Sequence, residues 1–176
     1  YFKLNSGTLS TVNKDFSIRA DDIILNGSIS TGSGDLSLYA TDMDTMFFGD
    51  TVGDYQLDSG ELRRITATNL NFGDETSKDI DVRAVATGNS DGISGTVVLN
   101  AISNGAKIVF NDVAHFGALE ANADDGITLD ADVYTDVGDL ALNADVDDSA
   151  DTSDILINNN VIVDSSRDII ISQDST

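Results

Sequence analysis

Short stretches of alternating apolar and polar residues recur along the whole chain. Each begins with a turn pair such as Gly-Asp or Lys-Asp, continues with apolar residues at every second position, and usually closes on Ala. Such alternation is typical of a β-strand with one buried face. The eight stretches are KDFSIRA from Lys14, GDLSLYA from Gly34, GDYQLDS from Gly53, KDIDVRA from Lys78, GTVVLNA from Gly95, GALEANA from Gly117, GDLALNA from Gly138 and RDIIISQ from Arg167.

The spacing of these stretches predicts a repeat architecture. Their starts lie 17 to 29 residues apart and average close to 22. Further short strands fit between them, within residues 23–29, 70–72, 107–110, 127–133 and 155–163. Two or three strands in each repeat, separated by Gly, Asp, Asn and Ser turns, are typical of a β-solenoid. We therefore expect an all-β fold, a right-handed parallel β-helix of about eight coils. The usual chirality of β-crossovers supports that hand.

One coil adds a family resemblance. The run GELRRITATNLNFGD, which begins at Gly60, resembles the recurring EL-x-x-I-T-A-x-x-L-x-x-G coil of filamentous-haemagglutinin-like repeat proteins. The flanking GDLSLYATDMD and KDIDVRAVAT are similar to neighbouring coils of that family, so the resemblance is clearest over residues 30–85. It implies a very long, exported, right-handed β-helical protein associated with adhesion, biofilm or contact-dependent competition. Residues 1–176 would then be a single solenoid segment, an excerpt of the shaft of a much longer chain.

Charge and composition limit the kinds of partner that the protein can bind and the compartments in which we expect it. The chain has 31 acidic and 9 basic residues, a formal net charge of -22, and no Cys. Binding to nucleic acid or to an anionic membrane surface needs clustered Lys and Arg, so both are disfavoured. No apolar run approaches the roughly 20 residues of a membrane-spanning helix. We expect an acidic protein, secreted or displayed on a bacterial cell surface, that neither binds nucleic acid nor inserts into a membrane.

The longest repeat contains an acidic insertion, residues 145–154, that is a candidate Ca²⁺ site. Alternate oxygen-bearing side chains there resemble the start of an EF-hand loop. Ala150 stands where that loop needs Gly, and Leu156 where it needs a bidentate Glu, so an EF-hand is excluded. A Ca²⁺-binding loop of another geometry and a merely solvated acidic loop both stay open. The candidate ligands are Asp145, Asp147, Ser149 and Asp151.

One dense apolar pair lies outside the alternation. Phe47 and Phe48 follow each other directly in Thr45-Met-Phe-Phe-Gly49. They either plug the core or cover a coil edge, or they provide a lateral contact with another chain. We retain the pair as a candidate interaction site.

Catalytic residues are sparse. His115 is the only His, so a His-based metal site or His dyad is excluded. Arg63, Arg64 and Arg83 lie near acidic residues in sequence, as a β-helical polysaccharide lyase or hydrolase would require. The alternative is that they balance surface charge. The acids in question are Asp58, Asp79 and Asp81. We expect no enzymatic activity and no catalytic residue.

These observations favour a structural role. The first interpretation is a shaft segment of a large secreted or surface adhesin-like protein. The second is a subunit of a self-assembling extracellular filament or sheath, because an uncapped β-helix end is a template for strand pairing. The third is a β-helical polysaccharide lyase or hydrolase. Expected partners are copies of the chain or neighbouring repeats, together with host or matrix glycans or proteins, and Ca²⁺ is the one candidate cofactor.

Overall fold

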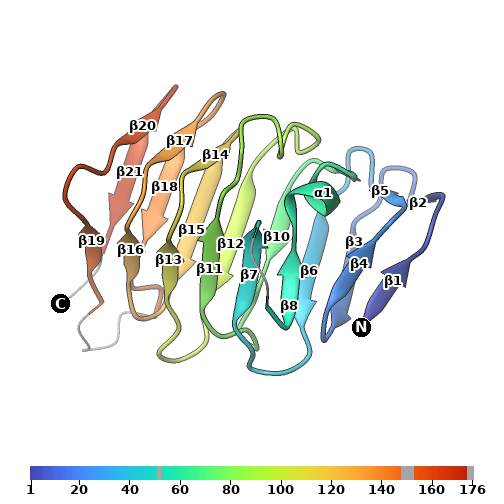
Figure 1. Ribbon diagram of the computed structural model, residues 1–176, viewed down its shortest axis with the longest axis horizontal. Coiled ribbons are helices and arrows are strands. Elements are labelled where there is room, and N and C mark those ends of the chain that lie inside the picture. The colour runs from blue at the N-terminus through green and yellow to red at the C-terminus, as the bar shows by residue number, and fades with distance from the viewer. Residues whose placement is uncertain (51–52, 148–152, 174–176) are drawn as a thin grey trace.

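The protein is an elongated stack of short parallel strands (Figure 1). The computed structural model describes residues 1–50, 53–147 and 153–173. Within these residues every strand pairing is parallel, and the N-terminus and C-terminus lie toward opposite ends of the stack. The expected all-β class is confirmed, and the sheet arrangement is compatible with a β-helix.

Seven strands form the longest sheet, called the long sheet below. Their order across the sheet follows their order along the chain. These strands carry most of the alternating stretches seen in the sequence. They are β3 (Phe16–Ala20), β6 (Leu36–Ala40), β10 (Leu70–Phe72), β12 (Val97–Ala101), β15 (Leu119–Ala123), β18 (Leu140–Asn143) and β21 (Ile169–Ser172).

A second sheet of six strands faces a different side of the core. Its order is β8-β7-β11-β13-β16-β19, and the two-stranded sheet of β1 and β4 lies beside β8. The bounds are β1 (Phe2–Leu4), β4 (Ile23–Leu25), β7 (Met46–Gly49), β8 (Tyr55–Leu57), β11 (Ile80–Arg83), β13 (Ile108–Phe110), β16 (Ile127–Leu129) and β19 (Ile155–Ile157).

Two three-stranded sheets, called the corner sheets below, complete the strand set. From β12 onward the chain visits the long sheet, the second sheet and a corner sheet in turn, three times over. The corner sheets contain β2 (Thr8–Ser10), β5 (Ser28–Ser30) and β9 (Ile65–Thr66), and β14 (Ala114–Phe116), β17 (Val133–Thr135) and β20 (Val163–Ser165); one short helix, α1 (Ser59–Leu62), precedes β9.

The core is a set of ladders in which inward side chains stack on their equivalents in the next strand. In the long sheet one ladder runs from Ile18 through Leu38, Phe72 and Leu99 to Ala121, in strict register. All of these side chains are buried. A one-residue slip would turn the whole inward row toward solvent, so burial of the row fixes the register.

The turn Asp of the Gly-Asp and Lys-Asp pairs has a structural role. The Asp35 N–H donates to the Asp15 carboxylate at 3.0 Å, and the Asn69 N–H donates to the Asp35 carboxylate at 3.1 Å. The Asp168 N–H donates to Asp139 in the same way at 3.2 Å. Each turn side chain therefore binds the backbone of the equivalent turn one strand further along. We call this series the turn ladder.

Two of the eight aligned stretches occupy a different sheet from the rest. GDYQLDS forms β8 and KDIDVRA forms β11, both in the second sheet, while β10 takes the corresponding place in the long sheet. Partners in the long sheet are consequently 20 residues apart at Phe16–Leu36 but 34 apart at Leu36–Leu70. Period-2 alternation does not specify the sheet to which a strand belongs. The count of about eight coils of 22 residues is therefore not confirmed.

Carboxylates join β4 to β8, where the second sheet meets the β1–β4 pair. The Gln56 N–H donates to Asp22 at 3.1 Å, and the Leu25 N–H donates to Glu61 Oε1 at 2.8 Å. Glu61 also closes a capping box with Asp58 at the start of α1. Burial raises the pKa of the Glu61 carboxyl. At this junction side-chain carboxylates accept hydrogen bonds from the backbone N–H groups. Within the paired strands of the stack, backbone carbonyls of the neighbouring strand do so.

Candidate functional site

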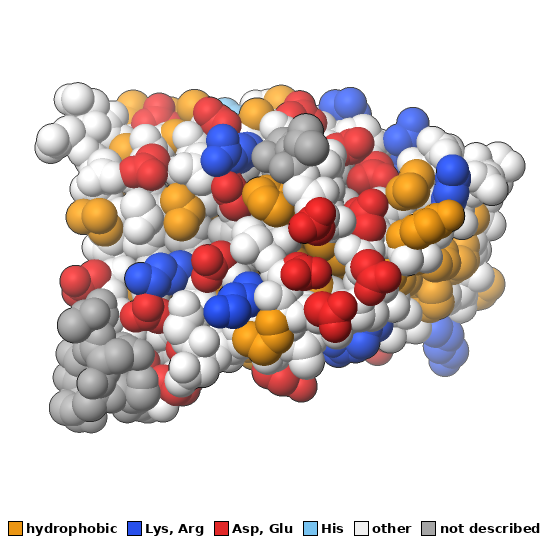
Figure 2. All heavy atoms as spheres, turned by 60° about the horizontal axis from the view of Figure 1, so that its bottom comes forward, with side chains coloured by type: hydrophobic (Ala, Val, Ile, Leu, Met, Phe, Trp, Pro, Cys, Tyr) orange, Lys and Arg blue, Asp and Glu red, His pale blue; other side chains and the backbone are white. Residues whose placement is uncertain are grey.

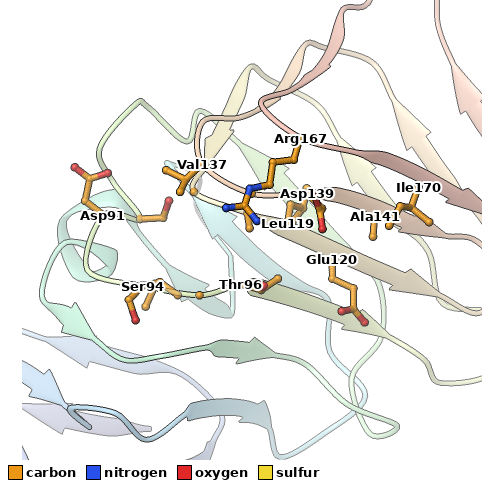
Figure 3. Close-up of a pocket in the computed structure, with 16 residues that line it drawn as sticks. Asp91, Ser94, Thr96, Leu119, Glu120, Val137, Asp139, Ala141, Arg167 and Ile170 are labelled. Atoms are coloured by element: carbon orange, nitrogen blue, oxygen red, sulfur yellow. The ribbon is translucent and has the colours of Figure 1, made fainter.

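An open groove of about 750 Å³ lies along the outer side of the long sheet. One wall is the segment that precedes β12, and the floor follows the turns that precede β15 and β18 (Figure 3). Gly117, Ala118 and Gly138 keep that floor low because their side chains are absent or small. The turns stack tightly, since a Cβ on Gly138 would lie 2.6 Å from the Cβ of Ala118.

Four charged side chains line this groove. Asp91, Glu120 and Asp139 contribute carboxylates, and Arg167 contributes the one guanidinium among the lining residues (Figure 3). The apolar contributions come from Val137, Ile170 and their neighbours. Aromatic side chains, which provide stacking platforms for sugars, are absent from its described lining.

A smaller depression of about 480 Å³ lies beside His115. His115 projects from β14 and stacks on Tyr134 of β17, with ring centroids 4.6 Å apart and planes 12° from parallel. The Tyr134 hydroxyl donates to Asp132 at 3.0 Å, and this hydrogen bond raises its pKa. The Asp136 carboxylate lies 3.9 Å from His115 Nδ1. His115 thus lies on a strand and belongs to an aromatic pair.

The candidate Ca²⁺ ligands are only partly described by the structure. Asp145 is buried and Asp147 is exposed. Ser149 and Asp151 lie outside the described residues. Across residues 1–50, 53–147 and 153–173 no group of three or more His, Cys, Asp or Glu side chains is arranged to hold a metal ion. Ca²⁺ binding by residues 145–151 stays a prediction.

The Phe47–Phe48 pair divides between the core and the surface. Phe48 is fully buried and contacts Phe72 edge-to-face at a centroid distance of 5.2 Å, as the alternative of a residue that plugs the core requires. Alternation along β7 turns Phe47 outward, where it is half-buried. The backbone of Gly53 packs on it, since a Cβ there would lie 1.9 Å from the ring. Only Phe47 remains a candidate contact residue.

The three arginines of the enzyme hypothesis make local structural contacts. Arg83 binds Asp81 with two hydrogen bonds of 3.0 and 3.1 Å. Arg63 donates to the Asn89 side chain at 2.7 Å, and Arg64 donates to the Gly60 carbonyl at 2.9 Å. The Arg83 contact matches the charge-balancing alternative, while Arg63 and Arg64 bind an amide side chain and a backbone carbonyl.

Sequence reasoning missed a basic residue that joins distant segments. Arg19 forms an ion pair with Asp74 and lies over the Tyr39 ring, 4.9 Å from its centroid. Burial acts to raise the pKa of Asp74, but hydrogen bonds from Thr76 and Arg19 outweigh it and hold that pKa below its usual range. A separation of 55 residues hides this pair from any local pattern. The groove residues were missed for the same reason.

Comparisons with known proteins identify no relative. No protein-family model, curated protein or solved structure matches the chain. In the described part of the chain no helix has the length and apolar character to cross a membrane.

Proposed function

We propose that the chain is a right-handed parallel β-helical shaft segment of a large secreted or cell-surface adhesin-like protein. The observation that carries the proposal is the registered stacking of seven parallel strands in the long sheet, with the chain ends at opposite ends of the stack (Figure 1). Such a stack can act as a rigid spacer, a role that needs no catalytic centre. The haemagglutinin-like run from Gly60 supports the same role.

Small-angle X-ray scattering of the 176-residue chain tests the proposal. An elongated, rigid particle whose long axis grows when further repeats are appended is the expected result. A spherical or flexible particle would contradict the spacer role. The net charge of -22 should keep such rods apart laterally, so scattering in low and high salt gives a second readout.

A filament or sheath subunit is the second candidate function. It is favoured by the long sheet, whose described strands all continue one parallel register that a further copy of the chain could extend. Uncovered strand edges pair with other strands. Chains that polymerise would build the shaft from many copies instead of from one long polypeptide.

A polysaccharide lyase or hydrolase has the groove as its support. Its charged residues, Glu120, Asp139 and Arg167, are the ones that a reaction there would use. Incubation with polyuronates and Ca²⁺, followed by absorbance of unsaturated products, tests this candidate. We expect no turnover; turnover lost in Arg167→Ala would replace the shaft proposal with an enzyme.

A further inference from the structure

A row of stacked rings on one corner sheet stops one position short. His115 of β14 and Tyr134 of β17 project outward from paired positions, with ring centroids 4.6 Å apart. On the other side of β14 the bridge between Val85 and Ala114 brings Ala86 next to His115, where a further ring of the row would lie. Ala86 is exposed, and its side chain is only a methyl group. The depression of about 480 Å³ beside His115 lies at this position.

The walls of this depression are held by the rest of the fold. The His115 N–H donates to the Val85 carbonyl at 2.8 Å. The segment that follows is anchored on α1, because the Asn89 side chain donates to the Ser59 hydroxyl and accepts from Arg63, both at 2.7 Å. Contacts to α1 on one side and to β17 on the other place the depression inside the stack rather than at either end of the sequence.

The shape of the depression suits a flat group on an aliphatic stem. Tyr134 covers one face of the His115 ring, and the opposite face is turned toward Ala86. The walls around that face are mostly aliphatic, with Ala84 and Val113 on its two sides. A guanidinium stacks on aromatic rings through its flat face, and the stem that carries it packs on apolar surface. The compact ammonium of a lysine does not stack in this way.

Charge around the depression favours a cation. Asp112 contributes a carboxylate to the lining, and Asp132 and Asp136 lie beside the same ring pair. Arg83 interacts with the charge of Asp112, but two hydrogen bonds hold it on Asp81, and it is not among the described lining residues. Figure 2 shows acidic side chains spread along the length of the visible face. With a net charge of -22, the chain attracts basic partners over a distance.

We propose that this depression binds an arginine side chain of a basic partner protein. The guanidinium lies over the open face of His115 as the next member of the ring row, at about the 4.8 Å spacing of neighbouring strands. Its charge faces Asp112, and its aliphatic stem packs on Ala84 and Val113. The partner is thereby held on the flank of the stack. This contact does not depend on whether the chain is a spacer or a filament subunit.

An NMR titration of the 176-residue chain tests the proposal. His115 is the only His, so its imidazole signals report on the depression without ambiguity. A capped tripeptide with Arg between two Gly should shift these signals to saturation, with a dissociation constant in roughly the millimolar range, since one side chain is bound. The same peptide with Lys has the charge without the flat group, and with citrulline it has the flat group without the charge. Each should bind at least about threefold more weakly.

A ring supplied by the chain itself should block the depression. In Ala86→Tyr the new ring occupies the open position on His115, so the arginine peptide should no longer shift the imidazole signals. Because Ala86 is exposed, thermal melting should show a folded variant. Ala141→Tyr is the matched control: it also places a ring on an outward Ala of a strand, but outside the depression, and it should bind like the wild type.

Two further substitutions separate stacking from charge. His115→Ala removes the ring and should abolish binding, whereas His115→Phe keeps a flat face and should retain it, as followed on the arginine δ-methylene signals of the peptide. Asp112→Asn should weaken binding about threefold. Asp42→Asn removes an exposed carboxylate of the turn after β6 and should leave binding unchanged.

Equal binding of the three peptides would overturn the proposal, as would binding that persists in Ala86→Tyr or in His115→Ala. An arginine peptide that leaves the imidazole signals unmoved well above millimolar concentration would overturn it as well. Signals that respond to cellotriose and to none of the peptides would identify a glycan site in place of an arginine site.

Discussion

The C-terminal half of the stack differs from the N-terminal half in how its strands are joined. From β12 to β20 each turn around the core contributes one strand to the long sheet, one to the second sheet and one to a corner sheet. Before β12 the order is broken, because β7 and β8 both join the second sheet and α1 follows. The connection between β7 and β8 spans only residues 50–54. The stacked rows of inward side chains can therefore accommodate an extra strand, provided that the core packing and the turns around it change.

Aromatic side chains fill the core beside the extra strand. Tyr55, Phe48, Phe72 and Phe116 are buried and form a chain of ring contacts with centroids 5.2 to 5.9 Å apart. Burial raises the pKa of the Tyr55 hydroxyl, and the charges of Asp22 and Glu61 add to this. In the regular half, Leu, Val and Ala occupy most of the inward positions. The irregular coils thus gather Phe48, Tyr55 and Phe72 around the extra strand, whereas Phe110 and Phe116 are the fully buried aromatic residues among the smaller aliphatic ones of the described regular half.

Removing one ring from the aromatic cluster should have the largest effect. We expect Phe72→Ala to lower the free energy of unfolding by about 3–5 kcal/mol, since it leaves a cavity among rigid rings. Urea denaturation followed by circular dichroism measures it. Ile171→Ala is the matched control, because Ile171 continues the same ladder in the open end and should cost far less. Equal losses in the two variants would remove the distinction between a packed centre and an open end.

Glycine positions provide the second comparison. Gly49 ends β7 with φ of 99°, and a Cβ there would lie 1.9 Å from the Arg83 carbonyl oxygen. Gly49→Ala should therefore cost more than about 2 kcal/mol, from backbone strain and from a clash between strands. Gly105→Ala tests strain alone, because Gly105 has φ of 78° and a Cβ at that position would meet no atom within 4 Å. Thermal melts of both variants should rank Gly49→Ala as the less stable.

The turn ladder predicts a smaller loss. Asp35→Ala removes the acceptor for the Asn69 N–H and for the Asn69 side-chain amide, both at 3.1 Å. The expected cost is about 1 kcal/mol in the free energy of unfolding. Asp42→Ala is the control, since Asp42 is exposed in the turn after β6 and its loss should change stability by less than about 0.5 kcal/mol. If the two variants have the same free energy of unfolding in urea denaturation, the turn ladder does not contribute to stability.

The carboxylate junction predicts a change in pH dependence. Burial, the largest cause, raises the pKa of Glu61 above its ordinary value of 4.5, against the hydrogen bonds from Leu25 and Asp58. A folded-state pKa above the unfolded value means that the associated stability is present at low pH and lost as pH rises through the raised pKa. The Gln side chain of Glu61→Gln does not ionise, so the variant does not lose this stability. As pH rises through the raised pKa, the free energy of unfolding of the variant should therefore increase relative to that of the wild type. Denaturation curves at several pH values above 4.5 measure the shift; parallel pH profiles would argue against it.

The sequence predicts strands well and their assignment to sheets poorly. Alternation located β3, β6, β12, β15, β18 and β21 correctly, because a half-buried strand leaves a local period of two. It misassigned β8 and β11, because both sheets of the stack require the same period. It also failed to separate Phe48 from Phe47, since the direction of a side chain depends on the register of β7.

The groove and the ion pairs could not be predicted from local sequence patterns. Arg167 reaches the groove from the connection before β21, while Asp91 comes from the segment before β12. Their proximity follows from the lengths of the intervening turns. The candidate Ca²⁺ loop remains a prediction from spacing, with Asp145 and Asp147 the two candidate ligands that the structure describes.

The register between β10 and β12 tests the stacked arrangement most directly. The structure pairs Asn71 with Val98, and both side chains point outward. The repeat alignment would instead pair Val98 with Asp81. The double variant Asn71→Cys/Val98→Cys should form an intramolecular disulfide under mild oxidation, since parallel neighbours lie about 4.8 Å apart. Crosslinking in Asp81→Cys/Val98→Cys, with none in Asn71→Cys/Val98→Cys, would contradict the arrangement described.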